Sequence, residues 1–221
     1  MSLRRPPTSR QLTLSRHREY LARLLFDSNH STSVGIRTKV PVVQNLFRRS
    51  LNMIHYTYKK SEILFVGINP HFGSFNRGVP FSNNKLFWYL LSEAGIIKEK
   101  REELRNDETL KRIYKEKFNA VYGLGLVNII NRPTQDVTKL NKGEELPGRK
   151  KISRIIKAET PKVVCFIGKV TYEKYTGSKD FSFGWQDTIG KSKVFVMHFP
   201  LRGEAIIRIR ELREVVRATQ D

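Results

Sequence analysis

Four short apolar stretches recur along the chain, and longer segments with apolar residues at helical spacing separate them. The apolar stretches cover residues 63–70, 122–134, 163–167 and 193–197. Each contains a continuous apolar run with the length and composition of a buried strand. The segments with helical spacing cover residues 85–95, 98–118, 147–160 and 204–216. This alternation predicts a three-layer α/β/α fold with a mainly parallel central sheet.

The pattern also predicts how individual elements are exposed. The strand that begins at residue 63 should end at Asn69-Pro70, because proline cannot donate a hydrogen bond to a neighbouring strand. We expect a long open loop from there to residue 85. Charges at three- and four-residue spacing in 98–118 predict a solvated surface helix. The helix 204–216 is expected to turn four residues inward, namely Ile206, Ile209, Leu212 and Val216.

Residues 1–60 differ from the rest and are predicted to form a basic N-terminal extension, with a single folded domain over 61–221. The first 18 residues contain five arginines and no acidic residue, which suits an arm that neutralises phosphates or a solubility tail. Two further helices are expected in the extension, over 15–26 and 40–58.

The net charge of the chain indicates which kinds of partner it could bind. The 221 residues include 41 lysines and arginines against 21 acidic residues, a net charge of +20. Such a balance favours a nucleic acid or an anionic membrane surface as the partner. No apolar run approaches the roughly 20 residues that span a bilayer, and no signal peptide is evident, so we expect a nucleic-acid-facing protein of the cytoplasm or nucleoid, or of the nucleus in a eukaryote.

The single cysteine, Cys165, excludes an internal disulfide, a cysteine-based zinc site and a cysteine-ligated iron–sulfur cluster. It lies inside the apolar stretch 163–167, where we interpret it as a small buried hydrophobe. A lone buried thiol is consistent with a reducing compartment.

Asn69 is the first candidate for chemistry, because ligands bind beyond the carboxyl ends of strands in open α/β sheets. An Asn-Pro pair after a strand can also be a simple turn. The surrounding motif favours a site: Gly67-Ile-Asn-Pro70 is followed by Gly78-Val-Pro-Phe81, Asn84-Lys-Leu-Phe-Trp88 and Glu93-Ala-Gly95.

These motifs closely resemble the mismatch-specific uracil/thymine DNA glycosylases of the uracil-DNA glycosylase superfamily, over about residues 62–217. The resemblance implies a monofunctional, monomeric enzyme of base excision repair that hydrolyses the bond to uracil, or thymine, in G·U and G·T mispairs. Its partners would be double-stranded DNA with a mispaired or deaminated base and the enzymes that process abasic sites. Water, with no metal or organic cofactor, would do the chemistry.

The resemblance also assigns a base pocket. Asn69 would orient the attacking water, and Phe81, twelve residues later, would stack on the flipped base. The remaining pocket positions are Gly67, Ile68, Ser74, Asn128 and Thr134, with the Ser74 hydroxyl favouring uracil over thymine. A second strand followed by Asn-x-x-x-Arg-x-Thr carries Asn128 and Thr134. Because the loop after Asn69 has no carboxylate, we expect a slow enzyme.

Two later segments depart from the family pattern or carry only a weak match. His198 stands where other branches of the superfamily place a histidine that donates to a pyrimidine oxygen, which a neutral imidazole could do, although it could equally cap the strand. The loop after it would insert Leu201 or Arg202 into the DNA stack, next to Gly203. Lys169, at the start of an expected helix that continues to residue 175, suits a DNA phosphate.

Two alternatives remain open from the sequence. A sister enzyme could excise another deaminated base such as hypoxanthine, in a wider pocket around Ser74 and Phe81. A non-enzymatic basic DNA-binding module would need only the charge.

Overall fold

The computed structural model describes residues 54–220. The expected arm 1–18 and helix 15–26 lie outside these residues. So does most of the expected helix 40–58, and its described part, 54–58, forms no helix.

A five-stranded sheet forms the centre of the described chain, in the order β2-β1-β3-β5-β4. Its strands are β1 (Ile63–Gly67), β2 (Leu124–Asn128), β3 (Val163–Ile167), β4 (Gly184–Ile189) and β5 (Ser192–Met197). Four strands run parallel, and β4 pairs antiparallel with β5 at one edge. The sheet is therefore mixed and mostly parallel, as the sequence predicted.

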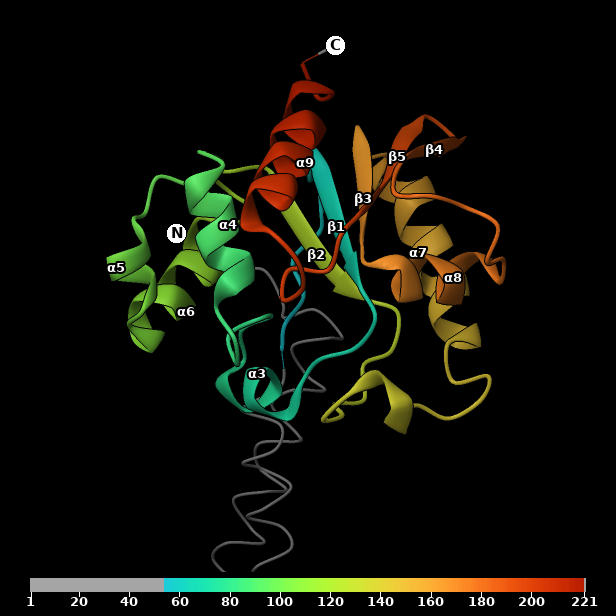
Figure 1. Ribbon diagram of the computed structural model, residues 1–221, viewed down its shortest axis with the longest axis horizontal. Coiled ribbons are helices and arrows are strands. Elements are labelled where there is room, and N and C mark those ends of the chain that lie inside the picture. Colours follow the sequence, from blue (N-terminus) through green and yellow to red (C-terminus); the bar gives the residue numbers. More distant parts are fainter. Residues whose placement is uncertain (1–53, 221) are drawn as a thin grey trace, which may run out of the picture. The chain divides into compact units, whose positions relative to one another are not determined.

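Two groups of helices cover the sheet and bury two apolar clusters against its faces (Figure 1). On one face lie α4 (Leu86–Glu93), α5 (Arg101–Leu104), α6 (Asp107–Glu116) and α9 (Ala205–Arg217). On the other lie α7 (Leu146–Glu159) and α8 (Lys169–Thr176). The three-layer α/β/α prediction is confirmed. No helix among the described residues is long and apolar enough to cross a bilayer.

Local details differ from the sequence-based expectations in four places. The loop after β1 is not open throughout, because it contains α3 (Phe72–Arg77), whose N-terminus is capped by His71. The segment 98–118 forms two short helices with a buried side, including Leu104 and Ile113, so it is more than a solvated surface helix. The edge strand β4 was not anticipated, since its residues alternate between partly buried and exposed positions.

The fourth difference concerns α9. Leu212 is buried as expected, but Ile206 is half-exposed, and the buried side of the helix includes Arg208 and Glu211. The prediction assumed that charged residues face solvent. In α9 these two charged residues instead form hydrogen bonds with the loop that precedes the helix.

This topology brings four separate sequence segments to one edge of the sheet. Because β1, β2, β3 and β5 are parallel, the residues at or just after their carboxyl ends lie near one another. The residues so placed are Asn69, Asn128, Lys169 and His198.

Candidate active site

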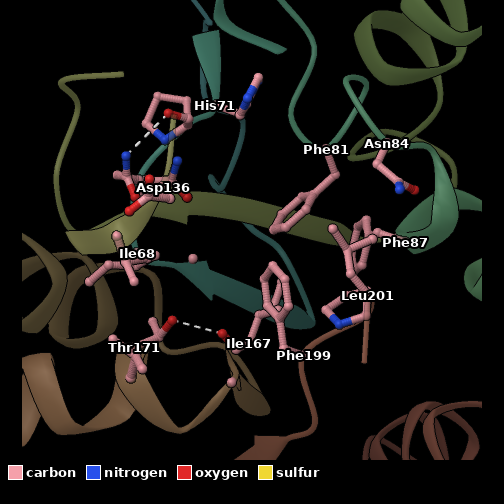
Figure 2. Close-up of a pocket in the computed structure, with 18 of the residues that line it drawn as sticks. Ile68, His71, Phe81, Asn84, Phe87, Asp136, Ile167, Thr171, Phe199 and Leu201 are labelled. Carbon is pink, nitrogen blue, oxygen red and sulfur yellow. Dashed lines mark hydrogen bonds between the residues drawn. The ribbon is translucent and has the colours of Figure 1, made fainter. Parts of the chain in front are cut away.

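A pocket of about 620 Å³ opens at this carboxyl edge. That volume lies within the roughly 300–1,000 Å³ typical of small-molecule sites. In Figure 2 the rings of Phe81 and Phe199 project into it, with Ile68 and Asp136 on one side and Phe87 and Leu201 on the other. The predicted site residues that line it are Gly67, Ile68, Asn69, Ser74, Phe81, Asn128, Thr134, Lys169, His198, Leu201 and Arg202. Gly203 lies next to them in sequence but does not line the pocket.

Asn69 is held by the loop that follows β2. Its Nδ2 donates to the Thr134 hydroxyl at 2.7 Å and to the carbonyls of Pro70 at 3.2 Å and Arg132 at 3.4 Å. Thr134 in turn donates to the Asp136 carbonyl at 2.7 Å, and its backbone pairs with Pro70 and His71. Since the amide nitrogen is occupied, the Asn69 Oδ1 is the atom available to accept a hydrogen bond from a bound molecule.

Asn128 presents the opposite arrangement at the end of β2. Its Nδ2 donates to the Tyr56 hydroxyl at 2.7 Å, while its Oδ1 is buried and has no hydrogen-bond partner among the described residues. Burial raises the pKa of Tyr56 well above its ordinary value, so this hydroxyl stays neutral. A buried acceptor without a partner costs free energy until a ligand satisfies it, and this one belongs to a pocket-lining residue.

Gly67 makes room for that amide. A Cβ at position 67 would lie 2.3 Å from the Asn128 Oδ1 and 3.6 Å from the Phe81 ring. Any larger residue at this position would therefore displace Asn128. The short distances also show that Phe81 and Asn128 border the same corner of the pocket.

Phe81 lies at this corner in an unusual backbone conformation. Its φ is +55°, a left-handed value that is uncommon for residues other than glycine. Its half-buried ring packs against Phe87, with centroids 4.7 Å apart. Phe87 therefore supports the Phe81 ring on one side. Because Phe81 also lines the pocket, its ring is available for stacking with a flat ligand.

Ser74 lies in α3 and is buried against the pocket. Its hydroxyl accepts the backbone N–H of Asn83 at 2.9 Å. The hydroxyl therefore ties α3 to the loop before α4.

His198 follows β5 and is held by Glu211 of α9. The Glu211 Oε1 lies 2.5 Å from the ring Nδ1, and its Oε2 accepts the His198 backbone N–H at 3.0 Å. Phe183 stacks on the imidazole, with centroids 3.5 Å apart and planes 21° apart. Because Glu211 engages Nδ1, the donor to the base that the sequence analysis expects would be Nε2.

The loop from 198 to 204 is tied to α9 by a buried arginine. Arg208 donates to the carbonyls of Arg202 and Gly203, and only 2% of its surface is exposed. Leu201 is 46% exposed at the mouth of the pocket. The loop is thus anchored at its base and presents an apolar side chain at its tip.

Lys169 lines another side of the pocket, and Arg132 supports the loop after β2 without lining it. Lys169, at the first position of α8, places its Nζ 5.0 Å from the centroid of the Phe183 ring. Arg132 forms a bidentate pair with Glu144, with both N···O distances 2.6 Å, and this hydrogen-bonded guanidinium lowers the pKa of Glu144 to about 2. The Arg132–Glu144 pair closes the loop that carries Thr134. Among the described residues, no group of three or more His, Cys, Asp or Glu could hold a metal ion.

Sequence reasoning missed several residues that the site uses. They are Tyr56, Asp136, Phe183, Arg208 and Glu211. Tyr56 lies 72 positions before its partner Asn128, and no local pattern links the two. Arg208 and Glu211 did carry a signal, because they fall on the inner side of α9 beside Leu212.

The fold and the pocket together define a class of protein: an α/β/α domain with a pocket of small-molecule size, lined by amides and aromatic rings, at the carboxyl edge of its sheet. Residues 54–204 match the model of the uracil DNA glycosylase superfamily, which is most of the chain. The protein belongs to that superfamily. Membership implies a DNA glycosylase, a hydrolase that acts on damaged bases in DNA.

Proposed function

We propose that the protein is a monofunctional DNA glycosylase that removes uracil, and more slowly thymine, from G·U and G·T mispairs. The observation that carries the proposal is the paired arrangement of two asparagines in one pocket. The nitrogen of the Asn69 amide is engaged by Thr134, which leaves its oxygen to orient a water, and the Asn128 oxygen is a buried acceptor without a partner among the described residues, which a base N–H would satisfy.

The water reaction follows from the first of these amides. An amide cannot take up a proton near neutral pH, so Asn69 aligns the water and does not act as a base. The water oxygen bonds to the sugar C1′, the C1′–N bond breaks, and its electron pair leaves on the base as an anion. The water proton passes to solvent or to the departing base. Catalysis then depends on donors aimed at that anion.

Base recognition follows from the second amide. Uracil and thymine carry an N–H between two carbonyls, and the unpartnered Asn128 Oδ1 can accept it. Phe81 would stack on the face of the flipped base, worth roughly 1–3 kcal/mol. Because the Ser74 hydroxyl is engaged by Asn83, its preference for uracil would act through the space it leaves for a methyl group.

The remaining site residues would engage the DNA. Lys169, an exposed cation at a helix N-terminus, suits a phosphate beside the flipped nucleotide. The exposed Leu201 or Arg202 would fill the gap in the stack, and Gly203, at φ +76°, would let the loop turn back toward α9. The abasic product would pass to the enzymes that complete base excision repair, in the nucleoid or nucleus. We expect the protein to act as a monomer.

One observation favours a second candidate, a glycosylase for hypoxanthine. The pocket of about 620 Å³ is roomy enough for a purine, and hypoxanthine also presents a ring N–H beside a carbonyl to an acceptor such as the Asn128 Oδ1.

The test is excision from a panel of labelled duplexes under single-turnover conditions. The panel carries one U·G, T·G, U·A or hypoxanthine·T pair, with single-stranded uracil alongside. We expect alkali-labile sites fastest at U·G and more slowly at T·G. Excision at hypoxanthine alone would move the protein to the second candidate. No excision of any base, with tight salt-sensitive binding, would leave a non-enzymatic DNA-binding module.

A further inference from the structure

Two aromatic rings reach the pocket from loops on either side of β3. Figure 2 shows the rings of Phe81 and Phe199 projecting into the cavity toward one another. Phe81 belongs to the segment after β1 and Phe199 to the loop after β5, and β3 lies between these two strands in the sheet. Ile167 and Gly168, at and just after the end of β3, line the same pocket. The two rings therefore flank the part of the pocket beyond the end of β3.

The Phe199 side chain is held at its base, whereas its ring is left open. A Cβ at Gly168 would lie 3.4 Å from the Phe199 Cβ, so the glycine allows the two loops to approach closely. Pro200 follows and restricts the Phe199 backbone to extended conformations. The Phe199 carbonyl accepts the Arg202 N–H at 3.2 Å, which closes a turn. The residue is nevertheless 38% exposed, so its ring offers apolar surface that a ligand can cover.

No aromatic side chain of the described residues takes the face of this ring. Phe81 packs against Phe87, and Phe183 stacks on His198, but Phe199 makes no ring contact with another aromatic side chain in this part of the chain. Exposed apolar surface inside a pocket is a feature of ligand sites, because a bound ligand removes it from water. The Phe199 ring is therefore available to a ligand of the pocket.

The polar atom that would recognise the edge of a base borders the same space. A Cβ at Gly67 would lie 2.3 Å from the Asn128 Oδ1 and 3.6 Å from the Phe81 ring. The buried Asn128 oxygen without a partner thus lies beside the Phe81 ring. A base whose N–H met this oxygen would present one face to Phe81 and its other face to the side from which Phe199 projects.

We propose that Phe81 and Phe199 form a two-sided slot that holds the flipped base by both faces, and that Phe199 is the residue that restricts the site to flat bases. The inference rests on the proposed glycosylase function and deepens it, since it names the shape of base that the pocket accepts. Stacking on an aromatic side chain requires a π-face and tolerates different bases. The polar edge alone would not separate a flat ring from a puckered ring that carries the same donors and acceptors.

Uracil and 5,6-dihydrouracil are the matched probes for this slot. Both carry an N–H between two carbonyls, so the Asn128 Oδ1 can accept the same hydrogen bond from each. Dihydrouracil lacks the C5–C6 double bond, and its two tetrahedral carbons pucker the ring and interrupt the π-face. A site that stacks on both faces should reject this ring more strongly than a site that stacks on one.

The matched variants are Phe199→Leu and Phe72→Leu. Leucine keeps an apolar side chain at each position but removes the ring. Phe72 lies in α3, is 50% exposed and does not line the pocket, so its substitution makes the same chemical change away from the slot. Phe81→Leu removes the opposite ring and should resemble Phe199→Leu.

The first measurement is an NMR titration of the isotope-labelled full chain with each free base, in the absence of DNA. We expect the wild type and Phe72→Leu to bind uracil about tenfold more tightly than dihydrouracil, as expected from aromatic stacking, and this ratio to fall several-fold in Phe199→Leu. An unchanged ratio in Phe199→Leu would overturn the proposal. Equal affinity of the wild type for the two bases, or no binding of uracil up to its solubility limit, would also overturn it.

The second measurement is single-turnover excision from a U·G duplex at saturating protein. We expect Phe199→Leu to be about tenfold slower than the wild type and Phe72→Leu to be unchanged. Slower excision with an unchanged ratio of base affinities would assign Phe199 to the loop alone and contradict the slot. If the wild type excises no base, the proposed function fails, whereas the affinities for the free bases still report on the slot.

Discussion

At the scale of single residues, the pocket depends on how two amide side chains are turned. The Asn69 Nδ2 donates a hydrogen bond to the Thr134 hydroxyl, and the Asn128 Nδ2 donates one to the Tyr56 hydroxyl. In each amide the oxygen is left without that partner. An amide that lost its partner could rotate and present the wrong group to the base or the water. The supporting hydroxyls therefore hold each amide in its orientation.

The first prediction concerns Tyr56→Phe. The variant leaves the Asn128 Nδ2 without its partner, at a cost of about 1–3 kcal/mol for a buried donor. We expect single-turnover excision of uracil to fall about tenfold, with weaker saturation by substrate, because the amide no longer holds its acceptor toward the base. Rates measured over a range of enzyme concentration separate the two effects.

Tyr58→Phe is the control for this substitution. Tyr58 lies two residues further along the same segment, and its hydroxyl makes no hydrogen bond with the described residues. It should excise uracil at the wild-type rate. Equal losses in both variants, or none in Tyr56→Phe, would show that Tyr56 does not orient Asn128.

Residues within a motif could be placed from the sequence, whereas their supports could not. Asn69, Phe81 and Asn128 line one pocket, and each ends a strand, follows one or lies at a fixed spacing after one. Tyr56 and Glu211 act through contacts between distant segments, which no local spacing encodes. The orientation of each amide likewise depends on a partner that only the folded chain supplies.

At the scale of elements, the loop between β5 and α9 is held as one unit with that helix. Arg208 donates hydrogen bonds to carbonyls of the loop. Glu211, one turn later, accepts the backbone N–H of His198 at the start of the loop. The exposed Leu201 therefore extends from a fixed base. The side chain that we propose for insertion into the DNA stack thus lies on an anchored loop.

The second prediction is that Arg208→Met loosens this loop. Methionine fills much of the same volume but cannot donate to the carbonyls of Arg202 and Gly203. We expect uracil excision from duplex DNA to fall several-fold more than excision from a single strand, since a single strand has no stack to open. The ratio of the two single-turnover rates is the measurement.

Arg213→Met serves as the matched control on α9. Arg213 also donates to backbone carbonyls, those of Glu93 and Ala94, but away from the pocket. Its duplex-to-single-strand ratio should stay at the wild-type value. A ratio that is equally unchanged in Arg208→Met would refute the role of the loop as a wedge.

Elements with a strong pattern were predictable, and those with a weak one were not. The parallel strands appear where continuous apolar runs predicted them, because both of their faces are buried. The edge strand β4 has one exposed side and mixed composition, so periodicity gave no signal. In α9 the inner side includes Arg208 and Glu211, since a loop with free carbonyls and a histidine needs charged partners.

At the scale of the whole molecule, we expect positive charge to govern the encounter with DNA. The net charge of +20 is spread along the chain, and the first 18 residues carry five arginines: Arg4, Arg5, Arg10, Arg16 and Arg18. Cations that neutralise phosphates release counterions, so affinity falls steeply with salt. Such contacts increase affinity for any duplex without choosing a base.

The third prediction is that replacing these five arginines by glutamine flattens the salt dependence. Each phosphate contact removed should lower the slope of log K against log salt by about 0.9. Single-turnover excision at saturating protein should stay unchanged, because none of the residues that line the described pocket is altered. Binding to an undamaged duplex at several salt concentrations gives the slope. An unchanged slope would assign the arginines to solubility alone.

The central claim is that Asn69 directs water at a flipped base, and Asn69→Ala tests it most directly. The measurement is single-turnover excision from a U·G duplex by this variant, and binding to the same duplex is measured in parallel. The control is Asn141→Ala, which lies at an exposed loop position outside the pocket lining. We predict excision reduced by at least about a hundredfold in Asn69→Ala, with duplex affinity retained, and a wild-type rate in the control. Excision by Asn69→Ala at the wild-type rate would contradict the account.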